Sequence, residues 1–155
     1  MIEGKFVLGT KGLEETAFIR SIVFTEEQGV PPNIEQDVYD AFAHHLIVKD
    51  GEETVGTGRL IYKDNQYLIG RIAVLPGFRG NRLGDLIVRM LCARAFDLKA
   101  DEVIVHSQVQ VADFYRKIGF KGISDVYKEA NIDHITMVID EKTLTNPCGC
   151  NGCSC

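Results

Sequence analysis

The sequence predicts one α/β domain built around a mixed β-sheet. Short apolar, β-branched stretches typical of strands lie both before and after a long stretch with apolar residues at helical spacing. The order of elements changes from a run of strands to alternating strands and helices, which predicts a sheet with antiparallel and parallel parts. The chain has 155 residues, 45% hydrophobic and 25% charged, so its length and composition suit one globular core.

The first part of the chain predicts a strand, a helix and an acidic segment. The strand covers residues 5–8, and apolar residues at helical spacing predict an amphipathic helix over 13–24. Gly29, Pro31 and Pro32 exclude a long helix after it. The segment is acidic through Glu26, Glu27, Glu35, Asp37 and Asp40. We therefore expect an acidic loop, with or without a short helix.

Three strands in succession are predicted next, at 45–49, 54–63 and 67–74. The turn pairs Asp50-Gly51 and Asp64-Asn65 separate them, so an antiparallel meander is expected.

The remaining elements alternate. A long amphipathic helix is predicted from the helical spacing of Leu83, Leu86, Ile87, Met90, Leu91 and Leu98. A strand at 102–105, a helix at 111–118 that ends at Gly119, and a strand at 135–139 complete the domain. We expect this domain to cover residues 1–145 and the cysteine-rich stretch 146–155 to lie outside it.

Charge and hydropathy exclude several classes of protein. The net charge of −5 disfavours binding to nucleic acid through phosphate contacts. No apolar run approaches the roughly 20 residues that cross a bilayer, and the N-terminal residues do not form a signal peptide, so a cytoplasmic protein without membrane contact is expected. Basic residues nevertheless gather near one glycine-containing turn, at Arg71, Arg79, Arg82, Arg89 and Arg94.

Residues 72–84 join the third strand of the meander to the long helix through a turn that holds three glycines. The first N–H groups of a helix have no partners within the helix, and its dipole is positive there. Gly80 and Gly84 allow a bulky anion to approach the backbone, and Arg79 and Arg82 add positive charge. The pattern predicts a cradle for a pyrophosphate group. It is neither a P-loop nor a dinucleotide-binding GxGxxG motif.

Several segments resemble the GNAT acetyltransferase superfamily. Residues 79–84 (RGNRLG) resemble the family's (Q/R)xxGx(G/A) motif, with Arg82 where many members have glycine, and residues 112–120 (ADFYRKIGF) resemble its Ax(x)FYxxxGF segment. Residues 23–31 (VFTEEQGVP) and 56–60 (GTGRL) resemble a YjcF/ElaA-like subgroup. The matches keep their order over nearly the whole chain, up to about residue 139.

The resemblance implies a mostly antiparallel sheet with helices on both faces and a V-shaped splay between the parallel strands 67–74 and 102–105. Acetyl-CoA would be the cosubstrate, with its pantetheine arm along the backbone of Ile72, Ala73 and Val74. Its pyrophosphate would lie on the turn formed by Arg79, Gly80, Asn81, Arg82, Leu83 and Gly84.

The resemblance also implies direct transfer of the acetyl group to an amine. Tyr115 would contact the coenzyme and act as the general acid that protonates the departing sulfur, since a phenol stays protonated at neutral pH. The backbone N–H of Val74 is a candidate oxyanion donor.

The proton acceptor is less defined by the sequence. Glu27 ranks first, because the acidic loop borders the acceptor site in this family. Glu35 and His106 are alternatives, and His134 ranks below them. Residues expected at the acceptor site are Glu27, Gln28, Glu35, Arg59 and His106.

Cysteines are distributed unevenly. Cys92 lies alone in the long helix and is expected to be a core residue. The others end the chain as Cys148, Cys150, Cys153 and Cys155, a set that suits either a thiolate metal site or reversible disulfides. Two alternative functions stay open: an acyl-CoA sensor without catalysis, and a metal- or thiol-handling protein acting through the tail. A homodimer is also open.

Overall fold

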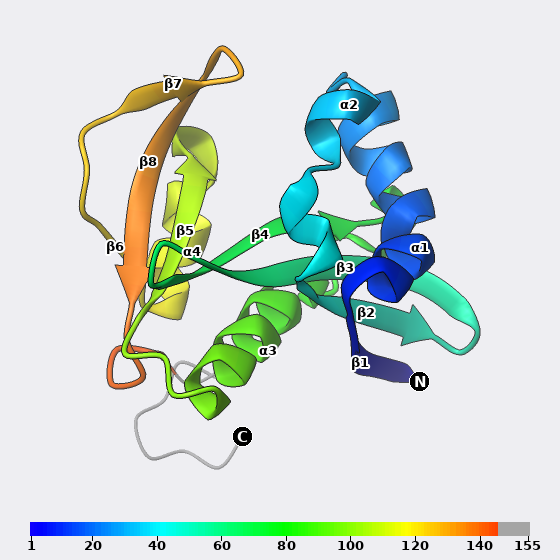
Figure 1. Cartoon of the computed structure of the whole chain (residues 1–155), viewed down its shortest axis with the longest axis horizontal. Coiled ribbons are helices and arrows are strands. Elements are labelled where there is room, and N and C mark those ends of the chain that lie inside the picture. The colour runs from blue at the N-terminus through cyan, green and yellow to red at the C-terminus, as the bar shows by residue number, and fades with distance from the viewer. Residues whose placement is uncertain (146–155) are drawn as a thin grey trace.

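The computed structural model describes residues 1–145, apart from the side chains at positions 33 and 34 (Figure 1). An eight-stranded sheet runs in the order β1-β2-β3-β4-β5-β8-β6, and β7 pairs with β8. The strands are β1 (Ile2–Leu8), β2 (His44–Asp50), β3 (Glu53–Lys63), β4 (Gln66–Val74), β5 (Val103–Gln108), β6 (Lys121–Gly122), β7 (Tyr127–Glu129) and β8 (Ile132–Ile139).

The helices connect and cover the strands. They are α1 (Gly9–Arg20), the π-helix η1 (Ser21–Glu27), α2 (Pro32–Glu35), η2 (Val38–Ala41), η3 (Pro76–Phe78), α3 (Leu83–Asp97), η4 (Val109–Val111) and α4 (Ala112–Ile118). Helices α1 and α3 lie on opposite faces of the β2–β4 part of the sheet (Figure 1). The expected α/β fold with a mixed sheet and helices on both faces is confirmed.

All strand pairs are antiparallel except β4 with β5. The connection between these two strands is α3, as parallel strands need a crossover. The main core lies between α3 and the sheet and includes Leu91, Val105 and Met137, all nearly or fully buried. A smaller core on the opposite face joins Ile19 and Val23 to Ala73 of β4.

The N-terminal helix differs from its predicted bounds. It begins at Gly9 and continues without a break into η1, which ends at Glu27. Gly9 has a φ of +65°, and a Cβ there would lie 2.8 Å from the carbonyl oxygen of Ala41, so this turn requires glycine. Apolar periodicity did not reveal the beginning of α1, because its first turn carries few apolar residues.

The acidic segment is more ordered than a loop. It forms α2 and η2, and the side chain of Asp37 accepts a hydrogen bond from the N–H of Tyr39 at the start of η2. Two of its acidic residues, Glu35 and Asp40, are buried. Arginines from neighbouring elements hydrogen-bond to both carboxylates and neutralise their charge.

Two short strands, β6 and β7, were not predicted. They hold two and three residues and are mostly polar, so they carry no apolar alternation. Pairing with β8 stabilises both of them. No helix within residues 1–145 is long and apolar enough to cross a membrane.

Candidate active site

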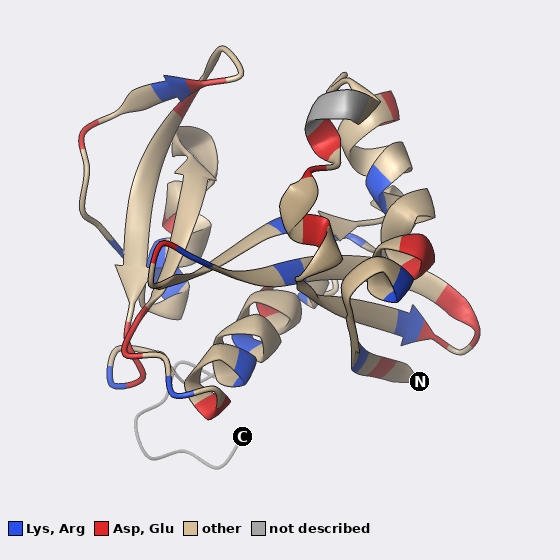
Figure 2. Ribbon diagram, in the orientation of Figure 1, with Lys and Arg blue, Asp and Glu red and all other residues tan. Residues whose placement is uncertain are grey.

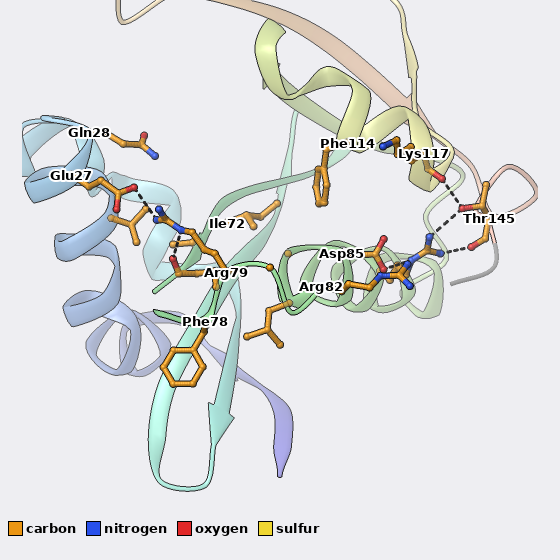
Figure 3. Close-up of a pocket in the computed structure, with 17 residues that line it drawn as sticks. Glu27, Gln28, Ile72, Phe78, Arg79, Arg82, Asp85, Phe114, Lys117 and Thr145 are labelled. Atoms are coloured by element: carbon orange, nitrogen blue, oxygen red, sulfur yellow. Dashed lines mark hydrogen bonds and ion pairs between the residues drawn. The ribbon is translucent and has the colours of Figure 1, made fainter. Parts of the chain in front are cut away.

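A cavity of about 980 Å³ opens where β4, the turn after it, α3 and α4 meet (Figure 3). The end of η1 forms one wall, and α4 with residue 145 forms the other. Its lining residues are Val23, Glu27, Gln28, Ile72, Ala73, Val74, Phe78, Arg79, Gly80, Arg82, Leu83, Gly84, Asp85, Arg89, Phe114, Lys117 and Thr145.

The splay between β4 and β5 creates the inner end of this cavity. The two strands pair at Tyr67↔Val103, Leu68↔Ile104 and Ile69↔Val105. Among the residues that the structure describes, no strand pairs with β4 on that side between Gly70 and Val74. The edge of β4 beyond Ile69 therefore has backbone groups available to a ligand that lies along it. Of the residues expected to hold a pantetheine arm, all three line the cavity: Ile72, Ala73 and Val74.

A β-bulge in β4 accompanies the splay. Thr57 pairs with Ala73 and Arg59 pairs with Gly70, so Gly58 alone faces both Arg71 and Ile72. Arg71 has a φ of +50°, which is rare for a residue with a side chain. Bulges bend a strand and redirect its side chains, and this one coincides with the place where β4 leaves β5.

The turn before α3 supplies the outer end of the cavity. Gly80 has a φ of +89°, a backbone conformation that favours glycine. The helix begins at Leu83, and the first N–H groups of α3, on Leu83, Gly84 and Asp85, belong to lining residues. A Cβ on Gly84 would lie 3.6 Å from the ring of Phe114, so glycine leaves this part of the cavity open.

The backbone conformation of Arg82 shows how the turn forms without the glycine that many family members have at this position. Arg82 precedes α3 with φ 60° and ψ 24°, the left-handed conformation that glycine adopts at little cost. The backbone shape that glycine provides elsewhere is thus kept here by an arginine, whose side chain lines the cavity.

Arg79 lies across the cavity from the helix start. Its Nη2 donates to the Glu27 carboxylate at 2.8 Å, and its Nε donates to the carbonyl oxygen of Val74 at 3.1 Å (Figure 3). The sequence assigned Arg79 to the coenzyme and Glu27 to proton transfer. The structure brings the two together as an ion pair, which links η1 to the end of β4.

Tyr115 lies beside the cavity rather than in its lining. Its side chain is 8% exposed and packs edge-on against Phe114 and Phe120. Burial raises the pKa of its hydroxyl above the ordinary value, so the phenol stays protonated. Phe114, its neighbour on α4, points into the cavity (Figure 3). The role of Tyr115 as a general acid stays a prediction.

Glu35 and Arg59, expected at the acceptor site, lie in a buried charge network instead of in the cavity. Arg20 donates to Glu35 and to Asp40, and Arg59 donates to Asp37 and Asp40 at 2.7–2.9 Å. Arg20, Glu35, Asp40 and Arg59 are each at most 6% exposed. Figure 2 shows acidic positions along the segment that forms α2 and η2, and basic positions on α1 and on the sheet.

Arg71 extends this network to the β-bulge. Its Nε donates to the carbonyl oxygen of Glu35 at 2.9 Å, and its Nη2 lies 3.5 Å from Asp37. The network therefore connects α1, α2, η2, β3 and β4 on the sheet face opposite α3.

Of the other residues expected at the site, one lines the cavity and the others lie outside its lining. Gln28 lines the cavity, whereas His106 lies on β5 outside it, with Nδ1 hydrogen-bonded to Tyr127 and Thr136. His134, the weaker base candidate, is bonded through Nδ1 to the carbonyl oxygen of Ile132. Asn81 lies in the turn next to lining residues, although it is not one of them.

Several lining residues were not predicted from the sequence: Phe78, Asp85, Arg89, Phe114, Lys117 and Thr145. Arg89 belongs to the basic cluster seen in the sequence, and it donates to Asp85 at 2.8 Å and to both oxygens of Thr145. Thr145 carried no signal, because only folding brings it beside α3.

The described cysteine behaves as expected of a core residue. Cys92 is fully buried, and burial raises the pKa of its thiol to about 12. The four cysteines considered as a metal or disulfide site lie outside the described residues. Within residues 1–145, no group of three or more His, Cys, Asp and Glu side chains is arranged to hold a metal ion.

Comparison with known proteins agrees with this geometry. Residues 19–141 match the model of the acetyltransferase (GNAT) domain family. The N-acetyltransferase YjcF of Bacillus subtilis is 35% identical over 129 residues, which cover 83% of this chain and 92% of that protein.

Solved structures share the fold. The crystal structure of Escherichia coli ElaA superposes with a TM-score of 0.77 at 25% identity and covers 89% of this chain and 99% of its own. A GNAT family acetyltransferase from Elizabethkingia anophelis, with acetyl-CoA bound, gives a TM-score of 0.69 at 16% identity, covering 90% and 97% of the two chains. The splayed strands, the glycine-containing turn and these matches agree, and the chain belongs to the GNAT acetyltransferase family, whose members transfer acyl groups from acyl-CoA.

Proposed function

We propose that this protein transfers the acetyl group of acetyl-CoA to a primary amine of a small molecule or peptide. The observation that carries the proposal is one cavity with two complementary ends. An open strand edge at Ile72–Val74 suits the amide groups of pantetheine, and the start of α3 suits a diphosphate. The E. anophelis relative of the same fold, which holds acetyl-CoA, supports acetyl as the group transferred.

The chain's own residues fit the coenzyme at both ends. Gly84 leaves room against Phe114, and the lining holds four basic side chains, Arg79, Arg82, Arg89 and Lys117, against two acidic ones, Glu27 and Asp85. This excess of positive charge favours a phosphorylated ligand. The basic side chains would hold the phosphates, while Phe78 and Phe114 supply apolar surface.

The proposed reaction is direct attack of the amine on the thioester. A neutral amine attacks the thioester carbonyl, a C–N bond forms, and the C–S bond breaks. One proton leaves the nitrogen and one reaches the coenzyme sulfur. We assign the second proton to Tyr115, whose raised pKa keeps it protonated, and the charge on the carbonyl oxygen to a backbone N–H on the open edge of β4 beyond Ile69.

Calorimetric titration with acetyl-CoA tests the binding step. Wild type should bind, and a variant with Arg79→Glu and Gly84→Glu should lose binding, because two carboxylates then face the phosphates. If well-folded wild type shows no binding, the proposal fails.

One observation favours a second function, an acyl-CoA sensor without catalysis. Tyr115 is 8% exposed and does not line the cavity. If its hydroxyl does not reach the coenzyme sulfur, the protein would bind acyl-CoA without transferring the acyl group. Thiol release from acetyl-CoA with a panel of amines separates the two functions. If Tyr115→Phe releases thiol more slowly than wild type, the result supports the enzyme. If wild type binds acetyl-CoA and releases no thiol, the result supports the sensor.

A further inference from the structure

A row of residues crosses the sheet where β4 and β5 separate. Arg59 of β3 pairs with Gly70 of β4, and His106 of β5 pairs with Thr136 of β8. The last β4–β5 pair is Ile69↔Val105, so Gly70 and His106 are the next residues on each strand. The row therefore reads Arg59, Gly70, His106 and Thr136, and it lies at the apex of the splay.

All of these residues face away from α3. Ile69 and Val105 belong to the main core under α3, and neighbouring residues of a strand point to opposite faces. Gly70 and His106 therefore present their side-chain positions to the face that holds the Arg59 network.

Gly70 leaves an opening in this row. A Cβ built on it meets nothing within 4 Å, and its φ is not in the left-handed region, so the backbone there does not require glycine. The opening lies between a carboxylate on one side, Asp37 bound to Arg59, and the imidazole of His106 on the other. Asp37 is 31% exposed at its side chain, so its charge reaches solvent.

His106 is held by two hydroxyl groups. Its Nδ1 lies 2.9 Å from the Tyr127 hydroxyl and 3.0 Å from Thr136 Oγ1, and these two hydroxyls are 3.0 Å apart. No group within residues 1–145 hydrogen-bonds Nε2, and the residue is exposed. If Nδ1 donates its proton to one of the hydroxyls, Nε2 keeps a lone pair.

The surroundings of the imidazole favour its neutral form. Desolvation by neighbouring groups lowers the pKa of His106 below its ordinary value, although part of the side chain reaches solvent. Glu129 on β7 opposes this shift, whereas His134 on β8 and Lys63 on β3 act with it.

We propose that the acceptor amine lies over Gly70 and that Nε2 of His106 takes its proton, with Thr136 and Tyr127 as positioning residues. The inference rests on the acetyl transfer proposed above. As the N–C bond forms, the proton moves from nitrogen to Nε2, the C–S bond breaks, and Tyr115 gives its proton to the sulfur and regains one from solvent. His106 then returns its proton to solvent.

The test measures thiol release from acetyl-CoA with n-butylamine, putrescine and a lysine-containing tripeptide, as a function of pH. Asn in place of His106 keeps a polar atom near Nδ1 but has no base at Nε2. His106→Asn should lower kcat/KM by about 100-fold or more and remove the fall in rate on the acidic side, below about pH 6.5. Acetyl-CoA affinity, measured by calorimetry, should stay unchanged, and His44→Asn on β2 serves as the matched histidine control.

A second variant tests the opening itself. Gly70→Val suits a strand and fills the space, so it should raise KM for the amine while KM for acetyl-CoA stays the same. The inference is overturned if wild type acetylates an amine and His106→Asn keeps both its rate and its acidic limb. Wild type that binds acetyl-CoA and acetylates none of the three amines would overturn the acceptor site together with the transfer. Absence of acetyl-CoA binding would refute the proposed function at its first step.

Discussion

Arg82 carries a backbone conformation that costs a residue with a Cβ roughly 1–2 kcal/mol. The sequence alone showed an arginine where related proteins often have glycine. The structure shows that the left-handed turn is kept and that the side chain lines the cavity. Arg82 therefore lowers the stability of the fold through its backbone conformation and places a positive charge near the start of α3.

Arg82→Gly should therefore raise stability and lower affinity. We expect a gain of about 1 kcal/mol in the free energy of unfolding, or roughly 2–4 °C in Tm for a chain of this length, and several-fold weaker acetyl-CoA binding with a smaller salt dependence. Thermal unfolding and calorimetry at two salt concentrations measure both effects. Arg82→Lys keeps charge and backbone conformation and is the control. Equal Tm values for the glycine and lysine variants would contradict a strained position.

Glu27 and Arg79 lie in one ion pair, with side chains 37% and 44% exposed. Pairs this exposed contribute about 0.2–1 kcal/mol, so Glu27→Gln should hardly change Tm. It releases Arg79 toward the phosphates, and acetyl-CoA should bind up to about fivefold more tightly. Asp113→Asn, which breaks the exposed pair with Arg116, should leave binding unchanged.

The pH profile of Glu27→Gln decides the sequence-based assignment of Glu27 as the base. We expect the acidic limb to remain, because the carboxylate already accepts a hydrogen bond from Arg79. Loss of the limb in this variant, and its retention in His106→Asn, would return the role to Glu27.

At the scale of elements, α3 both supports the core and forms the ligand site with its first turn. Gly84 weakens the helix, yet it keeps the space in front of Phe114 open. Gly84→Ala should raise the free energy of unfolding by about 0.5 kcal/mol, because alanine is the better helix former. The added methyl group stands in the cavity and should weaken acetyl-CoA binding.

Gly77→Ala is the matched control for this prediction. A Cβ there meets nothing within 4 Å, and Gly77 does not line the cavity. Tighter binding by Gly84→Ala than by wild type would show that the coenzyme does not pass over this turn.

The elements differ in how far the sequence predicts them. The meander, α3, β5, α4 and β8 have strong apolar periodicity or turn residues, and each was found within a few residues of its bounds. The π-helix η1 and the strands β6 and β7 have neither, since tertiary contacts stabilise them. In the site, the sequence alone identified the glycines and arginines of the turn before α3. The place of Thr145 depends on its hydrogen bonds to Arg89, Lys117 and Ile118, and the Gly70–His106 row depends on strand pairing. A single sequence specifies neither.

At the scale of the whole molecule, the buried charge network ties five elements together and makes stability depend on pH. Burial by itself raises the pKa of Asp40, but hydrogen bonds from Arg20 and the N–H of Asp37, with the charges of Arg20 and Arg59, bring it down to about 2. The folded pKa is below the unfolded value near 3.9. The carboxylate therefore stabilises the fold above about pH 4, and this contribution is lost as the pH falls toward 2.

Asp40→Asn should cost about 3 kcal/mol in the free energy of unfolding at pH 7, since it leaves two buried arginines without this charge. The difference from wild type should shrink as the pH falls from about 5 to 2.5, because wild type then loses the same interaction. Denaturant unfolding at several pH values measures it. Asp113→Asn is the exposed control, and a difference that stays constant with pH would contradict the role of the network.

Within residues 1–145, the strand contact between the two halves of the sheet, β1–β4 and β5–β8, consists of three residue pairs. The chain between α3 and β5, residues 98–102, crosses this junction at the surface. Division of the polypeptide in that loop would give two fragments that each keep their own antiparallel pairs. The junction between them borders the cavity, so the protein offers a split reporter whose reassembly a coenzyme A thioester should promote.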